Sequence, residues 1–187
     1  VKGLFRFLAG QDFFDYNGDC TENETGTTEV RDHVLGDIYH SQLIEVGVPD
    51  GSVEFSANNE ESYFRSINNY QGFKVEQQNR RNLIYAGSNS GLIHAFDSET
   101  GDDEWAFLPP ILIGKLPNII NKSLNGTVDG SKGGSNAIFG VDGSPVVHDV
   151  FIRGLSLDGT NVIVETEPDW RTILFVPFGR GGSGFTV

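Results

Sequence analysis

Methionine is absent from the 187 residues, and position 1 is Val1 rather than a translation start. We therefore expect the chain to be a fragment or a processed product of a longer protein, truncated at its C-terminus. A single cysteine, Cys20, excludes an internal disulfide framework and a four-cysteine zinc site. No apolar run reaches the roughly 18 residues of a membrane span, and the first residues lack the apolar centre of a signal peptide.

Basic residues are also scarce, because 13 Lys and Arg stand against 26 Asp and Glu, a net charge of −13. This charge repels a phosphate backbone, and no stripe of Lys or Arg offsets it locally, so we expect no nucleic-acid partner. Hydrophobic residues make up 37% of the chain, which is enough for a core. The composition thus indicates an acidic globular protein.

Residues 83–108 are the most regular part of the chain, with three short β-rich runs separated by turns at 88–91 and 98–101. This pattern predicts a three-stranded antiparallel meander. In the second turn Asp97 is placed to accept backbone amides, and Gly101 supplies a positive φ. The turn therefore has a physical mechanism and not only a favourable composition.

The residues before this meander predict two different kinds of structure. Residues 1–30 read as a lead-in strand, aromatic-rich at its start, followed by a polar loop. Residues 58–78 read as one short amphipathic helix, capped by Asn58 with Glu61. Its apolar face at helical spacing consists of Tyr63, Ile67 and Tyr70.

The residues after the meander predict a second set of strands. We expect a broken helical connection at 111–120, a strand at 141–152, a hairpin excursion at 158–168, a strand at 171–176, a glycine turn at 179–184 and a strand start at 185–187. Repeated meanders with long connections indicate an all-β protein, a partial β-propeller with one short helix and long loop insertions. Residues 31–187 are then its first blades, and Trp105 should bury apolar area between blades.

One loop carries oxygen ligands in alternation. Asp15, Asn17 and Asp19 follow the first, third and fifth positions of a calcium loop. Glycine comes at the fourth position instead of the sixth, and Gly26 stands where a bidentate Glu is needed. Calcium binding and a plain solvated loop are both open, and the missing positions favour the plain loop.

Two further features have structural explanations. Gly179, Gly181 and Gly184 fit a G-x-G-x-x-G pattern, but a β-like segment follows where a dinucleotide site needs a helix, so a hairpin turn is expected. His94 is expected to be a packed or hydrogen-bonded core residue, since no Ser, Cys or carboxylate partner is identified beside it. We expect no catalytic residue and no organic cofactor.

Five segments in order resemble the PilY/PilC family of type IV pilus proteins. Residues 35–41, LGDIYHS, resemble its LGDI-x-[HN]-S segment, and residues 81–97 resemble its R-x-x-x-Y-x-G-x-N-D-G-x-L-H-A-F-D signature. VDGSPV at 141–146, WRT at 170–172 and the terminal glycine run resemble further family elements. The signature residues are Leu35, Gly36, Asp37, Gly87, Asn89, Gly91, His94, Phe96, Asp97, Gly101, Trp105, Asp142, Gly143, Ser144, Pro145, Trp170 and Arg171.

The resemblance implies a pilus biogenesis factor and tip-associated adhesin. It implies the pilus tip, outer membrane or cell surface as location, and minor pilins, host cells or abiotic surfaces as partners. It also implies a calcium loop, expected beyond Val187 by family order. Two alternatives stay open: a quinoprotein dehydrogenase, because residues 85–105 also resemble propellers that hold pyrroloquinoline quinone, and a scaffold for outer-membrane assembly.

Overall fold

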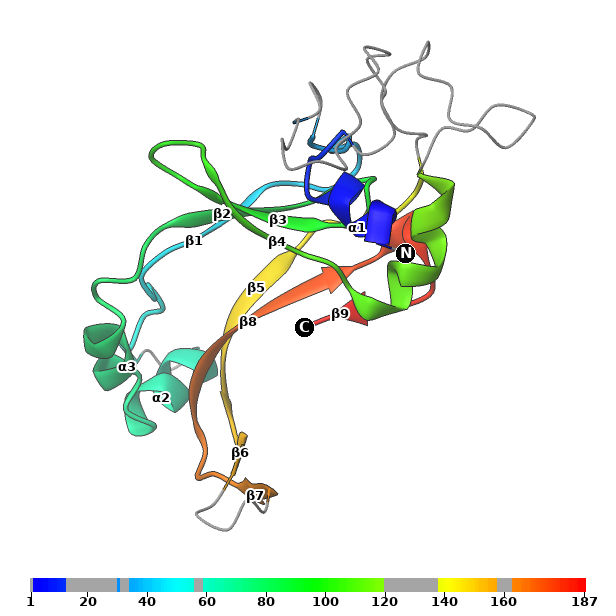
Figure 1. Cartoon of the computed structure of the whole chain (residues 1–187). Coiled ribbons are helices and arrows are strands. Elements are labelled where there is room, and N and C mark those ends of the chain that lie inside the picture. Colours follow the sequence, from blue (N-terminus) through cyan, green and yellow to red (C-terminus); the bar gives the residue numbers. More distant parts are fainter. Residues whose placement is uncertain (1, 13–29, 31–33, 56–58, 120–137, 158–162) are drawn as a thin grey trace, which may run out of the picture.

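The computed structural model describes residues 2–12, 30, 34–55, 59–119, 138–157 and 163–187 (Figure 1). This part of the chain contains a four-stranded and a three-stranded antiparallel sheet, a two-stranded hairpin and three short α-helices. No described helix is long and apolar enough to cross a membrane. The expected calcium residues Asp15, Asn17 and Asp19 lie outside the described residues.

The lead-in begins as a helix, α1 (Lys2–Leu8), and the expected strand is wrong here. Leu4, Phe7 and Leu8 recur at helical spacing, so one face of a helix can bury all three. Phe7 is fully buried against Leu116 and Ile119, and the other two pack at the edge of the same cluster. Packing therefore selects the helix in a short apolar run that local pattern leaves ambiguous.

The first sheet confirms the predicted meander and adds one strand to it. Its strands, in spatial order, are β1 (Ile44–Val46), β2 (Leu83–Gly87), β3 (Ile93–Asp97) and β4 (Asp103–Phe107). All neighbours are antiparallel, and the register between β3 and β4 shifts at Ala95 and Phe96. The strand β1 was not expected, because three residues are too few to show an alternation.

The turn between β3 and β4 has the predicted chemistry. Asp97 Oδ1 accepts the backbone amides of Glu99 at 2.9 Å and Thr100 at 3.0 Å. Gly101 has φ +78°, where a side chain would be strained. Arg81 Nη2 donates to the other oxygen of Asp97 at 2.5 Å, and these contacts hold the pKa of Asp97 at about 2.

Two helices replace the single helix expected before the meander. They are α2 (Glu60–Ile67) and α3 (Tyr70–Glu76). The break falls at Asn69, whose φ of +54° is incompatible with a continuous helix. The side chain that caps α2 belongs to Asn59, which accepts from the backbone amide of Ser62 at 3.0 Å.

The second sheet contains the strands expected after the meander. It consists of β5 (Val146–Ile152), β8 (Asp169–Pro177) and β9 (Phe185–Thr186), all antiparallel. The excursion between β5 and β8 is a hairpin of β6 (Leu155–Leu157) and β7 (Ile163–Glu165). The connection from the first sheet is the 3₁₀ segment Pro110–Asn118, in agreement with the expected broken helix.

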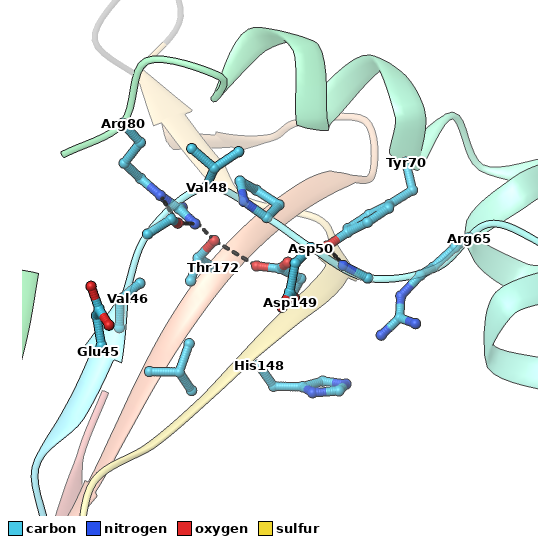
Figure 2. Close-up of a pocket in the computed structure, with 14 residues that line it drawn as sticks. Glu45, Val46, Val48, Asp50, Arg65, Tyr70, Arg80, His148, Asp149 and Thr172 are labelled. Atoms are coloured by element: carbon cyan, nitrogen blue, oxygen red, sulfur yellow. Dashed lines mark hydrogen bonds between the residues drawn. The ribbon is translucent and has the colours of Figure 1, made fainter. Parts of the chain in front are cut away.

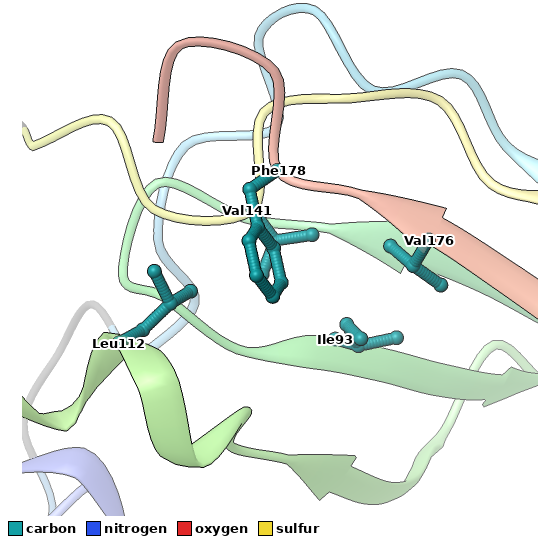
Figure 3. Close-up of a cluster of buried hydrophobic side chains, with 5 residues drawn as sticks. All are labelled: Ile93, Leu112, Val141, Val176 and Phe178. Carbon is teal, nitrogen blue, oxygen red and sulfur yellow. The ribbon is translucent and has the colours of Figure 1, made fainter. Parts of the chain in front are cut away.

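One apolar cluster joins the two sheets, and Figure 3 shows its five side chains. Ile93 comes from β3 and Val176 from β8, while Leu112 belongs to the 3₁₀ connection. Val141 and Phe178, from the loops that flank the second sheet, complete the cluster. The sheets therefore share one core and pack as neighbours.

Candidate functional site

The segment that leads into β1 crosses the loop between β2 and β3. Asn89 donates its backbone N–H to the carbonyl of Asp37 at 2.8 Å. A Cβ added to Gly36 would lie 2.6 Å from Cβ of Ser90, so no larger residue fits without movement. Gly87 donates its N–H to the hydroxyl of Ser41 at 2.9 Å. The LGDIYHS segment is thus fixed to the first sheet by backbone contacts.

The same segment also binds the second sheet. His40 Nδ1 lies 2.9 Å from both carboxylate oxygens of Asp142, which is only 4% exposed. Ser144 accepts the backbone N–H of Gln42 at 3.2 Å and donates to the carbonyl of His40 at 3.4 Å. A buried carboxylate is costly without a hydrogen-bond partner, and His40 is such a partner for Asp142.

The VDGSP loop and the terminal glycine run close the arrangement. Val141 donates its N–H to Ser88 at 3.0 Å, and Asp142 donates its N–H to Phe178 at 3.2 Å. A Cβ added to Gly181 would collide with the carbonyl oxygen of Gly140. We call residues 36–41, 87–91, 140–144 and 177–181 the blade junction, and nearly all its contacts use backbone groups or buried side chains.

A polar cavity of about 190 Å³ opens at a different place, between β1, β5 and the helical excursion (Figure 2). Its wall holds a line of hydrogen bonds. Arg80 Nη1 donates to Thr172 Oγ1 at 2.7 Å, and the Thr172 hydroxyl donates to Asp149 Oδ1 at 2.6 Å. Tyr70 donates its phenol proton to Asp149 Oδ2 at 2.5 Å. The guanidinium of Arg80 also binds the carbonyl of Gly47.

This line of hydrogen bonds keeps Tyr70 in its neutral form. Burial, together with the hydrogen bond to Asp149 and the charge of that residue, raises the pKa of Tyr70 to about 12. A phenol with this pKa is a donor at neutral pH and not a base. Each oxygen of Asp149 accepts a hydrogen bond, from Tyr70 and from Thr172, so the cluster holds the cavity wall together.

The structure brings about half of the predicted signature residues together. The junction contains Gly36, Asp37, Gly87, Asn89, Gly91, Asp142, Gly143 and Ser144. Asp97 and Gly101 form a separate turn, and Leu35 is exposed. Trp170 is buried with Tyr70 and Phe73 and donates Nε1–H to the carbonyl of Asn68 at 2.7 Å.

Two expectations about the meander need correction. Trp105 is 45% exposed, so the expected burial between blades is wrong for the described residues. Its ring meets Tyr85 edge-on at 5.7 Å and lines an open apolar groove towards β8 and β9. His94 is buried, as expected, but it does have a carboxylate beside it, because Nδ1 lies 2.8 Å from Asp103. The register shift between β3 and β4 places Asp103 opposite Phe96 and so close to His94.

The residues of the cavity wall escaped sequence reasoning. Arg80, Asp149 and Thr172 lie far apart in the chain, and only Thr172 falls in a family segment, the WRT element at 170–172, where no role was expected for it. One signal was present: Asp149 interrupts the apolar strand VVHDVFI, and a carboxylate in such a strand needs a buried partner. The identity of that partner, Tyr70, depends on tertiary structure.

Two antiparallel sheets that share one core and are joined by decorated loops define neighbouring blades of a partial β-propeller. The model of a known family, the PilY1 beta-propeller domain, matches residues 35–185. The chain belongs to the PilY1 family. The matched range includes all residues of the blade junction.

Individual relatives show the same affiliation. The type IV pilus biogenesis factor PilY1 homolog of Xylella fastidiosa is 30% identical over 162 residues, which are 87% of this chain and 11% of the relative. The type IV pilus biogenesis factor PilY1 of Pseudomonas aeruginosa strain UCBPP-PA14 is 34% identical over 154 residues, 82% of this chain and 11% of the relative.

The protein of the same name from P. aeruginosa strain PAK is 30% identical over 176 residues, 94% of this chain and 13% of the relative. The chain therefore spans only 11–13% of the length of these relatives. No solved structure matches the chain.

Proposed function

We propose that this chain is a non-enzymatic propeller module of a type IV pilus biogenesis factor. The observation that carries the proposal is the blade junction, where four family segments meet through backbone contacts and through the contact of His40 with the buried carboxylate of Asp142. Residues used in this way hold blades together and do not act on a substrate. The names of the relatives support the pilus role over a quinoprotein dehydrogenase.

The location and partners of the module follow the same proposal. We place it at the pilus tip, at the outer membrane or on the cell surface, in contact with minor pilins. Adhesion to host cells or abiotic surfaces is the finer part of the proposal. Calcium at Asp15, Asn17 and Asp19 stays a prediction, as does the family's calcium loop beyond Val187.

The non-enzymatic part of the proposal is supported by the hydrogen bonds of the polar cavity. Tyr70, Thr172 and Arg80 all donate hydrogen bonds to fixed partners inside the cavity wall. A chain loaded with pyrroloquinoline quinone should therefore reduce no dye.

A genetic experiment tests the role of the module. In a piliated bacterium, the gene for the full-length protein is replaced by one that carries Asp142→Ala. Surface pili are then counted, and twitching motility is measured. We expect fewer pili, because the change leaves His40 without its buried partner. Glu99→Gln, an exposed change in the β3–β4 turn, is the matched control and should leave pili unchanged.

A deletion separates a folding defect from a lack of function. The full-length protein without residues 35–185 should reach the cell surface but support few pili. Normal pilus numbers and motility in this strain would contradict the proposal. Dye reduction that depends on the quinone would contradict its non-enzymatic part.

A further inference from the structure

The helical excursion between β1 and β2 turns an apolar face to solvent. On α2, Tyr63 and Ile67 are 49% and 59% exposed, while the fully buried residue of this helix is the polar Ser62. Phe55 is 60% exposed, and its ring lies 5.0 Å from that of Tyr63. Phe64 adds a half-exposed ring that touches Phe151 at 5.9 Å.

These four side chains, Phe55, Tyr63, Phe64 and Ile67, form one continuous surface that we call the α2 patch. The ring contact joins Phe55 to the helix, and spacings of three and four residues join the other three along it. Figure 1 shows α2 and α3 at one end of the molecule, far from α1. A hairpin connection needs only roughly two to five residues, whereas residues 47–82 connect β1 to β2 here. The fold of the sheet does not require this excursion.

Two exposed glutamates border the patch. Glu60 lies one helical turn before Tyr63 and Phe64 and so shares their face. Glu54 precedes Phe55, and both of these glutamates are exposed. Arg65 is mostly buried, and its guanidinium is held by Glu61 at 2.5 Å and by the face of Tyr70. The patch therefore has an apolar centre and an acidic rim.

We propose that the α2 patch binds a segment of another protein, an amphipathic helix whose apolar row is flanked by Lys or Arg. The acidic rim attracts basic flanks and repels a second copy of this chain, whose net charge is −13. The row from Glu60 to Ile67 is roughly 10 Å long, which matches two turns of a docked helix. Exposed aromatic side chains supply most of the energy in such contacts.

Peptide binding to the intact 187-residue chain tests the proposal. The probe is a labelled peptide of roughly 15 residues, long enough for a helix to form on the surface, with one leucine face flanked by lysines. A second peptide has glutamates in place of the lysines. The lysine peptide should bind at least about tenfold more tightly, and added salt should reduce this difference.

Matched variants locate the binding. The double change Tyr63→Ser and Ile67→Ser should weaken the lysine peptide by about tenfold or more, as for central interface residues. Ile111→Ser, at a residue that is 67% exposed but lies on the 3₁₀ connection, is the control and should change affinity less than about twofold. The pair Glu54→Gln and Glu60→Gln should reduce the preference for the lysine peptide.

Several results would overturn the proposal. They are no binding of the lysine peptide, equal binding of both peptides, or equal losses in the double variant and the control. A dimer in sedimentation that the double variant abolishes would assign the patch to a second copy. Capture by lipid vesicles that depends on Tyr63 and Ile67 would assign it to a membrane surface.

Discussion

The phenol of Tyr70 donates its proton to Asp149, 79 residues further along the chain, over 2.5 Å. Tyr70 belongs to the helical excursion of the first blade and Asp149 to the first strand of the second. The bond therefore ties the excursion to the neighbouring blade. It also gives a hydrogen-bond donor to one oxygen of a half-buried carboxylate, whose other oxygen accepts from Thr172.

Tyr70→Phe should lower the free energy of unfolding by about 1.5–3 kcal/mol, because a hydrogen bond to a charged group is lost in a partly buried site. Urea unfolding of both proteins measures this loss. Tyr39→Phe removes the same hydroxyl from a side chain that is 71% exposed and should cost less than about 0.5 kcal/mol. Equal losses in the two variants would show that the contact contributes nothing.

Stability at high pH should depend on the same phenol. The pKa of Tyr70 is raised from 10.0 to about 12, chiefly by burial, so the folded protein keeps its proton where the unfolded chain loses it. This contribution is complete below pH 10 and disappears as the pH rises through 12. Urea midpoints measured from pH 9 to 12 should fall more steeply for the wild type than for Tyr70→Phe. Parallel curves would contradict the raised pKa.

The blade junction should tolerate no side chain at position 181. Gly181→Ala brings a Cβ onto the carbonyl oxygen of Gly140, so backbone must move, at a cost of about 1–3 kcal/mol. Gly114→Ala is the control, because no atom lies within 4 Å of its added Cβ, and it should stay within about 0.5 kcal/mol. Thermal unfolding compares the two, and similar midpoints would mean that the junction is loosely packed.

The two tryptophans should differ in their contribution to the stability of this chain. Trp170 is 6% exposed and packs on Tyr70 and Phe73, so Trp170→Ala should cost about 3–5 kcal/mol. Trp105→Ala should cost less than half as much, because the side chain is already half in water. Urea unfolding of each variant gives the numbers. A larger loss for Trp105 would mean that its groove is closed in solution.

Local chemistry was sufficient for the meander. The alternation of residues 83–108 and the turn residues Asp97 and Gly101 act over a few positions, so the sequence by itself determined these strands and their connection. The strands of the second sheet were predictable for the same reason. Family membership also followed from short segments in a fixed order, which the match to residues 35–185 confirms.

Tertiary structure alone decided which surfaces are buried. The run at 2–8 is a helix because Phe7 packs on Leu116 and Ile119, more than a hundred residues away. In the sequence, Tyr63 and Ile67 have the spacing of one helix face with Tyr70. Only Tyr70 is buried, because the helix breaks at Asn69, between Ile67 and Tyr70.

The partners of the two carboxylates Asp142 and Asp149 were equally out of reach of the sequence. His40 meets Asp142 across 102 positions, and Tyr70 meets Asp149 across 79. Periodicity carries information only about neighbours on one helix face or one strand. Which distant charges meet depends on how the two sheets pack, and that is set by the shared core around Val141 and Phe178.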